Sequence, residues 1–387
     1  MARIWNKHKQ SNTPLKRKVF VGMSGGVDSS VTAALLKKRG FDVCGIHIKM
    51  WSDPRIPCQF KEDRRDALRV AMKLDIPFET WDLTEEYRNE VVNYMIREYA
   101  AGRTPNPDVM CNRKIKFGVF LQKAIERGAD YIATGHYVRL KSEFDAIMGD
   151  SEGSQGNFSV VPQNDMRDSF HLHQAADTNK DQSYFLWTLT QDQLKHCMFP
   201  LGEYTKPHVR KLAEQFGLST AEKPDSQGIC FIGQIDLNNY LKQYIPETKG
   251  RIVTSAGNDI GQHEGLAFYT IGQREGLGIG GGIPYYVAKK DFKANTLIVG
   301  KGPFDEQLFT CQLFAHDVHW IFGKELEFPL KCNARIRYRQ PLQDAMVYQE
   351  KSGHISVVFD EPQRAITSGQ SIVFYQDNEM LGGACIS

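Results

Sequence analysis

The sequence lacks several features that mark common classes of protein. None of its apolar runs approaches the roughly 20 residues that a membrane helix needs, and no hydrophobic signal core appears near the N-terminus. It also lacks a strong charge of one sign, since 48 Lys and Arg face 46 Asp and Glu for a net charge of +2. These absences predict a soluble, cytoplasmic protein without membrane contact. They exclude a globally basic nucleic-acid wrapper but leave room for local basic patches.

Closely spaced cysteines are also missing. The eight cysteines lie at positions 44, 58, 111, 197, 230, 311, 332 and 385, and none forms a C-x-x-C pair. Because structural zinc sites and iron–sulfur clusters are built on such pairs, we expect neither. Most of these thiols should be reduced and buried, so a cysteine with a chemical role has to be identified by its surroundings.

The length and the N-terminus set the expected organisation. With 387 residues the chain exceeds one typical domain, which predicts two or three. Residues 1–17 contain several basic side chains and no acid. They are typical of a loose basic tail, and a short organellar presequence is the alternative.

Strand and helix patterns alternate through the first half of the chain. This alternation predicts an α/β domain over residues 1–222 with a doubly wound parallel sheet. From about residue 226 the pattern changes to short β-like runs separated by Gly, Pro and Asp. The change predicts a small central β-rich domain over 223–299 and a C-terminal β-barrel, or a sandwich, over 300–387.

Two segments of the first half are less regular. Residues 141–168 are polar and contain glycine, so we expect a long surface loop or a hairpin. Residues 180–197 and 206–218 carry apolar side chains at helical spacing, which predicts two further helices.

The stretch SGGVDSS, residues 24–30, joins a short apolar strand to a helix. Such a turn leaves the first helical N–H groups unpaired and directs the positive end of the helix dipole at the loop, so its natural ligand is an anion, usually a phosphate. The loop lacks the lysine of the G-x-x-x-x-G-K-[ST] phosphate loop. Gly25 and Gly26 allow close approach of an anion, the serines offer donors, and Asp28 is a candidate for holding Mg²⁺. A glycine turn without a ligand is the alternative.

Two cysteines have distinctive surroundings. Cys111 follows the stiff segment TPNPD, at the expected start of a helix, and has several cations close by. A thiolate is favoured in such a place, so Cys111 is a candidate nucleophile, with an inert buried thiol as the alternative. Cys230 follows KPDSQGI, 119 residues later. The pair would suit sulfur delivery, in which a persulfide attacks and the partner thiol resolves it as a disulfide, although Cys230 alone is also typical of a core cysteine.

The stretch NARIRYRQ, residues 333–340, alternates basic and other side chains. As a strand it would place Arg335, Arg337 and Arg339 on one face, a row suited to phosphates. A solvated edge strand that uses charge against aggregation is the alternative.

Seven motifs together resemble one family. S-G-G-x-D-S after a strand is similar to the signature of the ATP pyrophosphatases, which adenylate a carbonyl oxygen. With NPDVMCNRKIKF, ATGHYVR, KDQSYFL, KPDSQGICFIG, TIGQREGLGIGG and IRYRQ, the chain closely resembles the tRNA-specific 2-thiouridylases, in order from about residue 18 to 387.

The resemblance implies roles for individual residues. ATP would be bound by Gly22, Met23, Ser24, Gly25, Gly26, Val27, Asp28, Ser29, Met50 and Gly135. Cys230 would carry the persulfide, and Cys111 would be the nucleophile that closes a transient disulfide with it. Asn106, Pro107 and Asp108 would approach the target base, with Asp108 as an acid or a base. The tRNA would contact His136, Lys180, Asp181, Gln182, Arg337, Tyr338 and Gln370.

The implied activity is ATP-dependent 2-thiolation of the wobble uridine, position 34, of tRNA. It would proceed by adenylation of uridine O2 and sulfur transfer from the persulfide, with Mg²⁺ accompanying ATP. The implied partners are tRNAs for Lys, Glu and Gln and a cysteine desulfurase or sulfur-relay protein. The segment 141–168 departs from the family by its length. Two alternatives are an amide-forming ATP pyrophosphatase that acts on a small carboxylate and an RNA-binding protein with a vestigial nucleotide site.

Overall fold

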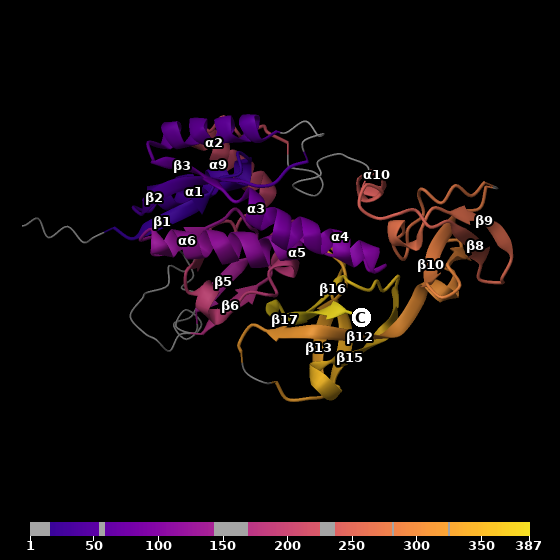
Figure 1. Cartoon of the computed structure of the whole chain (residues 1–387). Coiled ribbons are helices and arrows are strands. Elements are labelled where there is room, and N and C mark those ends of the chain that lie inside the picture. Colours follow the sequence, from indigo (N-terminus) through magenta and orange to yellow (C-terminus); the bar gives the residue numbers. More distant parts are fainter. Residues whose placement is uncertain (1–15, 54–58, 143–168, 225–236, 281, 324–325) are drawn as a thin grey trace, which may run out of the picture.

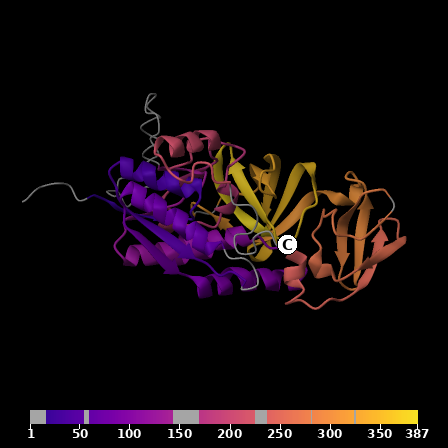
Figure 2. The same cartoon turned by 90° about the horizontal axis from the view of Figure 1, so that it is seen from above.

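The chain folds into three units that follow one another along the sequence. A computed structural model describes residues 16–53, 59–142, 169–224, 237–280, 282–323 and 326–387. A parallel sheet covered by helices comes first, then a small β unit, then a barrel, which confirms the predicted fold class (Figure 1). The small unit lies at the opposite end of the molecule from β1–β3 in both views (Figures 1 and 2).

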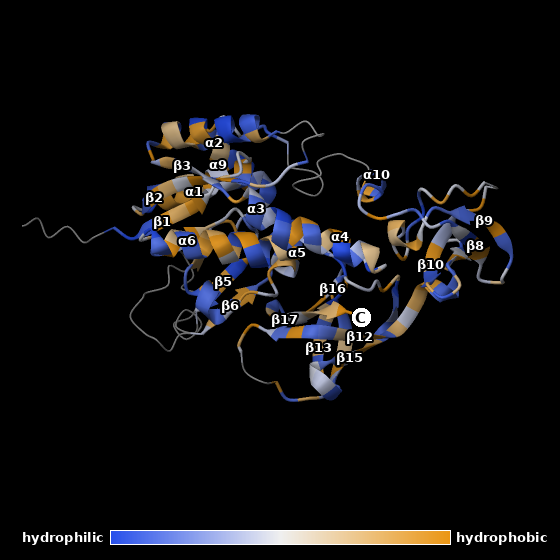
Figure 3. Ribbon diagram, viewed as in Figure 1, coloured by the Kyte–Doolittle hydropathy of each residue, from blue (hydrophilic) through white to orange (hydrophobic). Residues whose placement is uncertain are grey.

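The first sheet has the strand order β3-β2-β1-β4-β7, and every neighbouring pair is parallel. Its strands are β1 (Lys18–Gly22), β2 (Asp42–Lys49), β3 (Phe78–Asp82), β4 (Tyr131–Ala133) and β7 (Cys197–Met198). Successive side chains of a strand point to opposite faces, so Val19 and Val21 pack on one side of the sheet and Phe20 on the other. Both faces of the sheet are therefore apolar, and Figure 3 shows that β1 consists mainly of hydrophobic residues.

Helices cover both faces. One layer holds α1 (Val27–Lys38), α2 (Phe60–Leu74) and α9 (Lys206–Gln215). The other holds α3 (Thr84–Tyr87), the π-helix η1 (Arg88–Val92), α4 (Asn93–Ala100), α5 (Pro107–Met110), the π-helix η2 (Cys111–Phe120) and α6 (Leu121–Glu126). The α2 helix shows the expected division, since Ala67, Val70 and Ala71 are buried and most of its charged side chains face outward. No helix in these ranges or elsewhere among the described residues is long and apolar enough to cross a membrane.

The helix predicted over 180–197 is wrong. The chain forms only a short 3₁₀ turn, η3 (Ser183–Phe185), and a short helix, α8 (Gln191–Leu194). Tyr184, Leu186 and Leu189 between or within them are all buried. These side chains fill the space between the sheet and the barrel from an irregular backbone, so their apolar spacing was not that of one helical face.

The central unit is a four-stranded sheet preceded by a short helix, α10 (Leu237–Leu241). The strand order is β10-β11-β8-β9. The elements are β8 (Gly250–Thr254), β9 (Asp259–His263), η4 (Leu266–Phe268), β10 (Tyr285–Asp291) and β11 (Thr296–Lys301).

The last unit is a closed barrel of six strands in the order β12-β15-β14-β13-β16-β17, in which β17 pairs back onto β12. The elements are η5 (Glu306–Leu308), β12 (Phe309–Trp320), β13 (Leu330–Arg335), β14 (Gln343–Gln349), η6 (Lys351–Gly353), β15 (Ile355–Arg364), β16 (Ser371–Gln376) and β17 (Glu379–Ile386). Of the two predicted alternatives for this region, the barrel is therefore the one that forms.

A hairpin from the first domain extends the barrel. Strands β5 (Arg139–Ser142) and β6 (Phe170–His173) pair antiparallel, and β6 then pairs with β17. Of the segment 141–168 that was predicted as a loop or a hairpin, only Lys141 and Ser142 at the end of β5 are described, and residues 143–168 lie outside the described residues. Residues 1–15 of the predicted basic tail lie outside them as well. The hairpin joins the first and last units into one sheet.

The predicted basic face on 333–340 is wrong. Strand β13 ends at Arg335, and the side chain of Arg335 is buried, where it forms an ion pair with Asp181. Asp181, for which the resemblance implied a tRNA contact, is 2% exposed and also accepts hydrogen bonds from Ser183 Oγ at 3.0 Å and Ala175 N at 3.1 Å. A buried guanidinium needs a buried acceptor, and this requirement turned the first arginine of the row inward.

Replacing Arg335 by methionine should destabilise the protein, because Asp181 would remain as an uncompensated buried charge. We expect R335M to lower the free energy of unfolding by about 3–5 kcal/mol. Urea unfolding followed by tryptophan fluorescence measures the change. The control K195M removes the exposed ion pair with Asp192 and should leave the midpoint unchanged. Equal midpoints for R335M and the parent would contradict this account.

Candidate functional site

The candidate site lies where the strand order of the parallel sheet reverses. Strand β1 has β2 on one side and β4 on the other, and ligands of such sheets bind outside the carboxyl ends of the strands at this point. Three strands end there, and each is followed by candidate residues: 23–26 after β1, Met50 after β2, and 134–136 after β4. The fold therefore brings together the loop, Met50 and Gly135, for which the resemblance implied nucleotide contacts.

The loop after β1 can form only because Gly25 has no side chain. Its φ is +84°, and a Cβ there would lie 2.3 Å from the carbonyl oxygen of Asp63. Gly26 follows as the N-cap of α1 without a side-chain cap, which leaves the start of the helix open to an anion. Ser29 Oγ and Ser30 Oγ both donate to Gly26 O, at 3.2 and 2.7 Å, so two of the three predicted donors stabilise the loop itself.

Gly135 holds the end of β4 against this loop. A Cβ on Gly135 would lie 2.9 Å from the carbonyl carbon of Asp28 and 2.9 Å from the backbone nitrogen of Ser29. Real Cβ atoms essentially never approach backbone atoms that closely, so a larger residue would push the two segments apart. Gly135 thus allows the segment after β4 to pack directly against the first turn of α1, which carries Asp28.

Asp28 has two partners that the sequence did not reveal. Lys206 Nζ lies 2.8 Å from both carboxylate oxygens, and Tyr137 Oη donates to Oδ1 at 2.7 Å. The lysine side chain is 11% exposed and that of Asp28 is 32% exposed. Lys206 begins α9, and its backbone nitrogen donates to Asp177 at 2.8 Å. The loop over residues 24–30 contains no lysine of its own, but the fold places Lys206 beside it.

This arrangement fits phosphate better than a bare metal ion. Both oxygens of Asp28 are bonded to Lys206, and one carboxylate is too few ligands for a protein-held Mg²⁺. Among the described residues no group of three His, Cys, Asp or Glu could hold a metal ion. A magnesium ion here would have to arrive with a polyphosphate that supplies the remaining oxygens.

A second group of candidate residues begins at the loop before α5. The side chain of Asn106 accepts from Val109 N at 3.3 Å as the N-cap, and Pro107 is the first helical residue. Gln370 Nε2 donates to the carbonyl oxygens of Thr104 and Pro105, both at 2.9 Å. The barrel residue Gln370 thus holds the loop that leads into α5, which begins with Pro107 and Asp108 after the N-cap Asn106.

Cys111 lies farther into the helix than predicted. The helix begins at Pro107, so Cys111 is in the second turn, and the expected N-terminal position is wrong by four residues. Its side chain is buried, at 4% exposure, and it is the first residue of η2. Segments of π-helix are rare and frequently occur at functional sites. Cys230 lies outside the described residues, so its distance from Cys111 and their disulfide stay predictions.

Asp108 is linked to the sheet through Lys116 and His136. Burial raises the pKa of Asp108, and the nearby charge of Lys116 opposes that rise. Lys116 Nζ lies 3.4 Å from His136 Nε2, and His136 Nδ1 lies 2.7 Å from Thr134 Oγ1. Burial, with Lys116 adding to it, lowers the pKa of His136 well below its usual value, so the ring is neutral. Because an ammonium group only donates, His136 Nε2 accepts and Nδ1–H donates to Thr134.

The other candidate residues lie at the junction of the first domain and the barrel. The Gln182 side chain accepts from Tyr137 N at 3.0 Å, and its backbone nitrogen donates to Tyr137 O at 2.9 Å. Tyr338 packs against Phe185 with ring centroids 4.6 Å apart. Arg337 Nη2 donates to Ala365 O at 2.8 Å. Lys180 is only partly buried. Gln182 therefore supports the segment that carries Tyr137.

Comparisons with known proteins cover almost the whole chain. Three family models match in order: a tRNA methyl transferase HUP domain over residues 17–234, a tRNA methyl transferase PRC-barrel domain over 238–301, and an aminomethyltransferase beta-barrel domain over 310–386. A tRNA-specific 2-thiouridylase MnmA of Streptococcus uberis is 47% identical over 378 residues, 96% of this chain and 95% of that protein. The protein of the same name from Streptococcus thermophilus is 47% identical over 379 residues, again 96% and 95%.

Removal of the Lys206 charge should weaken nucleotide binding. We expect K206M to bind ATP roughly tenfold or more weakly than the parent, because a charge-assisted contact to phosphate would be lost. Isothermal titration with ATP and Mg²⁺ measures the effect. The exposed Lys211 of the same helix provides the matched control K211M, which should bind normally. Parental affinity in K206M would exclude Lys206 from the phosphate site.

Proposed function

Because the chain belongs to the tRNA-specific 2-thiouridylase family, sulfurtransferases that act on a tRNA uridine, we propose that it thiolates C2 of the wobble uridine, position 34, in an ATP-dependent reaction. The single observation that carries this proposal is the glycine loop at the sheet's switch point, with Asp28 bonded to Lys206. Such a loop is suited to binding and orienting a nucleoside triphosphate.

The first step would activate the base. ATP would bind with its phosphates at the start of α1, and Lys206 would move from Asp28 to the phosphates. Mg²⁺ bound with ATP would neutralise the departing pyrophosphate. Once Lys206 has left Asp28, the free carboxylate would be available as a ligand to this Mg²⁺. Uridine O2 would attack the α-phosphorus while Asp108 accepts the N3 proton, and the N3–H electron pair would form the C2–N3 double bond. The products of this step are an adenylated base and pyrophosphate.

The second step would exchange oxygen for sulfur. The terminal sulfur of a Cys230 persulfide, or sulfide released from it, would attack C2, and AMP would leave with the former O2. Cys111 would attack the Cys230 sulfur and close a disulfide, which leaves the sulfur on C2. An external thiol reductant would have to supply two electrons and two protons to restore both cysteines. The sulfur would come from a cysteine desulfurase, directly or through a relay protein.

The tRNA would lie across the junction of the first domain and the barrel. The target base must leave the anticodon stack to reach the site, which a single-stranded loop permits at low cost. Asn106 and Pro107 directly precede Asp108 at the start of α5, after a loop held by Gln370, which supports a role in placing the base. Lys180, Arg337 and Tyr338 would contact parts of the tRNA other than the target base. The acceptors would be the tRNAs for Lys, Glu and Gln.

Pyrophosphate release distinguishes this function from its two alternatives. The proposed enzyme should release pyrophosphate only when tRNA is present. An amide-forming ATP pyrophosphatase would release it with a small carboxylate and no tRNA. An RNA-binding protein with a vestigial nucleotide site would bind tRNA and release none.

Replacing either catalytic cysteine by serine should abolish thiolation. We expect tRNA incubated with the parent, ATP, Mg²⁺, cysteine and a cysteine desulfurase to be retarded on a mercury-containing gel, because mercury binds the thiocarbonyl sulfur. C111S and C230S should give no retardation, and the exposed Cys311 provides the control C311S. Retardation that persists without both cysteines would contradict the cysteine assignment. No retardation with the parent would contradict the function. A methylated tRNA would give this result, because it carries no thiocarbonyl sulfur.

The acid side of the pH profile should report Asp108. The carboxylate is the form that accepts a proton, and burial raises the pKa of Asp108, so this form is lost as the pH falls through the raised value. We expect kcat/KM for tRNA to fall with it, at a higher pH than for an ordinary aspartate. D108N should lose that limb and reduce the rate by roughly 10²–10⁴-fold. A single-turnover pH series checks this, and an unchanged limb in D108N would assign the titration to another group.

A further inference from the structure

The segment 102–106, which joins α4 to α5, is held by the central unit as well as by the barrel. Lys290 Nζ, on β10, donates to the carbonyl oxygen of Gly102 at 3.0 Å. Thr270, which follows η4, shares a hydrogen bond of 3.1 Å between its Oγ1 and Thr104 Oγ1. The barrel bonds two carbonyl groups of the same segment. All three units therefore meet at the segment that leads to α5.

The chain leaves α4 at Gly102, whose conformation favours glycine. Its φ is +76°, its N–H donates to Tyr99 O at 2.8 Å, and Arg103 N donates to Glu98 O at 2.9 Å. These two bonds around a left-handed residue are the usual way to end a helix. A Cβ on Gly102 would also overlap the ring of Phe292, which follows β10. The central unit thus packs directly against the end of α4.

Lys290 brings a positive charge to this helix end. Burial lowers the pKa of Lys290 to about 8, and among the described residues its side chain has no ion-pair partner. The carbonyl groups at the C-terminal end of a helix carry partial negative charge and attract a cation. The end of α4 and the carbonyl oxygen of Gly102 therefore take the place of an acidic partner. This lysine connects two units, unlike an ordinary surface lysine.

Apolar packing supports the lysine contact. The 3₁₀ turn η4 of the central unit packs against α4. Tyr99 of α4, Leu266 and Phe268 of η4, and Val287 of β10 belong to one cluster of buried apolar residues. Figure 1 shows α4 running from the first domain toward the central unit. The central unit is therefore fixed against the helix whose end Lys290 contacts.

The position of the segment 102–106 determines where the reacting groups lie. The segment ends at Asn106, the N-cap of α5, Asp108 is the second residue of that helix, and Cys111 follows at the start of η2. Because the first turn of a helix sets its direction, a shift of the segment would move both side chains. A displacement of about 1 Å can lower a reaction rate by roughly 10²-fold.

We propose that the central unit positions the reacting residues, with Lys290 as the positioning residue that holds the segment 102–106 in place. The proposal rests on the proposed function, because it takes Asp108 and Cys111 as groups that react. It gives the central unit a role in the chemistry that does not require contact with tRNA. Lys290 acts through the segment and touches no reacting atom, so it is not a catalytic residue.

The first test separates the rate of the reaction from the binding of its substrates. K290M removes the ammonium group and keeps the aliphatic chain, and the exposed Lys289 of the same strand provides the matched control K289M. We expect K290M to lower the single-turnover rate of thiolation at saturating ATP and tRNA by roughly tenfold or more. Its dissociation constants for ATP and tRNA should stay within about twofold of the parental values. K289M should match the parent in rate and in both constants.

The second test requires no activity. Movement of the segment should expose Cys111, which is 4% exposed, to iodoacetamide. We expect Cys111 to be alkylated roughly threefold or more faster in K290M than in the parent, because its helix opens more often. Mass spectrometry of the peptide that contains Cys111 measures the rate. The exposed Cys311 of the same molecules should react at an unchanged rate and serves as the internal reference.

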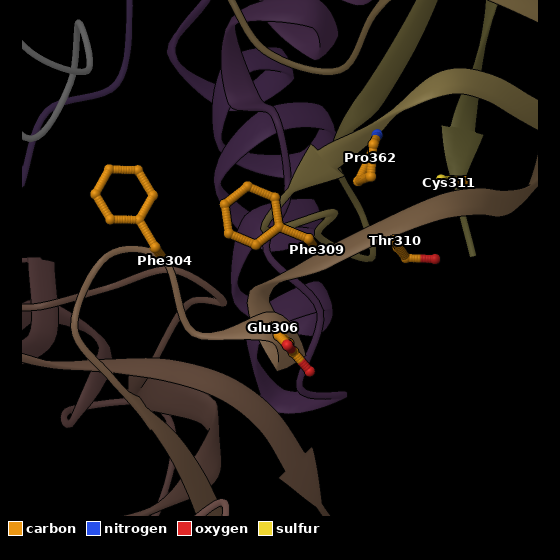
Figure 4. A pocket seen from close by; sticks show the side chains of 6 residues that line it. All are labelled: Phe304, Glu306, Phe309, Thr310, Cys311 and Pro362. Carbon is orange, nitrogen blue, oxygen red and sulfur yellow. The ribbon is translucent and has the colours of Figure 1, made fainter.

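A second pair of variants tests the same contact without changing a charge. F292A removes the ring that lies on Gly102 and should lower the single-turnover rate in the same direction as K290M. The matched control is F304A, because Phe304 is also an exposed phenylalanine but lies in a hollow beside the start of β12 (Figure 4). F304A should react at the parental rate.

The outcomes distinguish positioning from two other roles of the contact. A parental rate in K290M, or a loss that comes only from weaker binding of tRNA, would overturn the proposal. A lowered melting temperature with a parental rate and parental alkylation of Cys111 would mean a purely structural contact and would overturn it as well. Absence of thiolation by the parent would overturn the proposed function, whereas the alkylation rates would still decide whether Lys290 holds the segment.

Discussion

The contact between Asp28 and Lys206 is the interaction on which the rest of the site depends. It joins the loop after β1 to the first residue of α9 and places a lysine beside a glycine turn that has none of its own. The pair is only partly exposed, so its attraction is less screened than that of a surface ion pair. Gly135 and Tyr137, which follow β4, lie against the same Asp28. A phosphate would compete with Asp28 for the same ammonium group, which links nucleotide binding to a rearrangement of charge.

The barrel contributes to this site although it is the most distant unit in sequence. Strand β6 joins β17, Arg335 pairs with Asp181, and Gln370 bonds the carbonyl groups of Thr104 and Pro105. The first two contacts join the first domain to the barrel, and the third holds the loop before α5 on the barrel. Under the proposed function, a tRNA bound to the barrel would contact the unit that also holds the loop before α5.

The sequence was sufficient for features that arise from local patterns. Alternating strand and helix periods predicted the parallel sheet, and the glycines predicted the turn between β1 and α1, because backbone geometry there depends on residues next to one another. The start of α5 was also predictable in principle, since Asn106 followed by Pro107 is a favoured N-cap and first-turn pair. We had expected the helix to start at Cys111, which placed this residue too near the N-terminal end of the helix.

Long-range contacts were not predictable in the same way. Lys206 reaches Asp28 across 178 residues, and no local pattern distinguishes it from other lysines at the start of a helix. Arg335 appeared to continue a basic row, but a buried carboxylate from another unit determined its direction. The apolar residues of 180–197 resembled a helix because a segment enclosed by two units is apolar on every side.

In the proposed reaction, uridine O2 becomes an oxygen of AMP before sulfur replaces it. The most direct measurement uses tRNA carrying oxygen-18 at O2 of the wobble uridine, followed by mass spectrometry of the AMP formed during thiolation. The account predicts one labelled oxygen in each AMP, paired with one 2-thiouridine. Unlabelled AMP alongside thiolated tRNA, with the label in water, would contradict it.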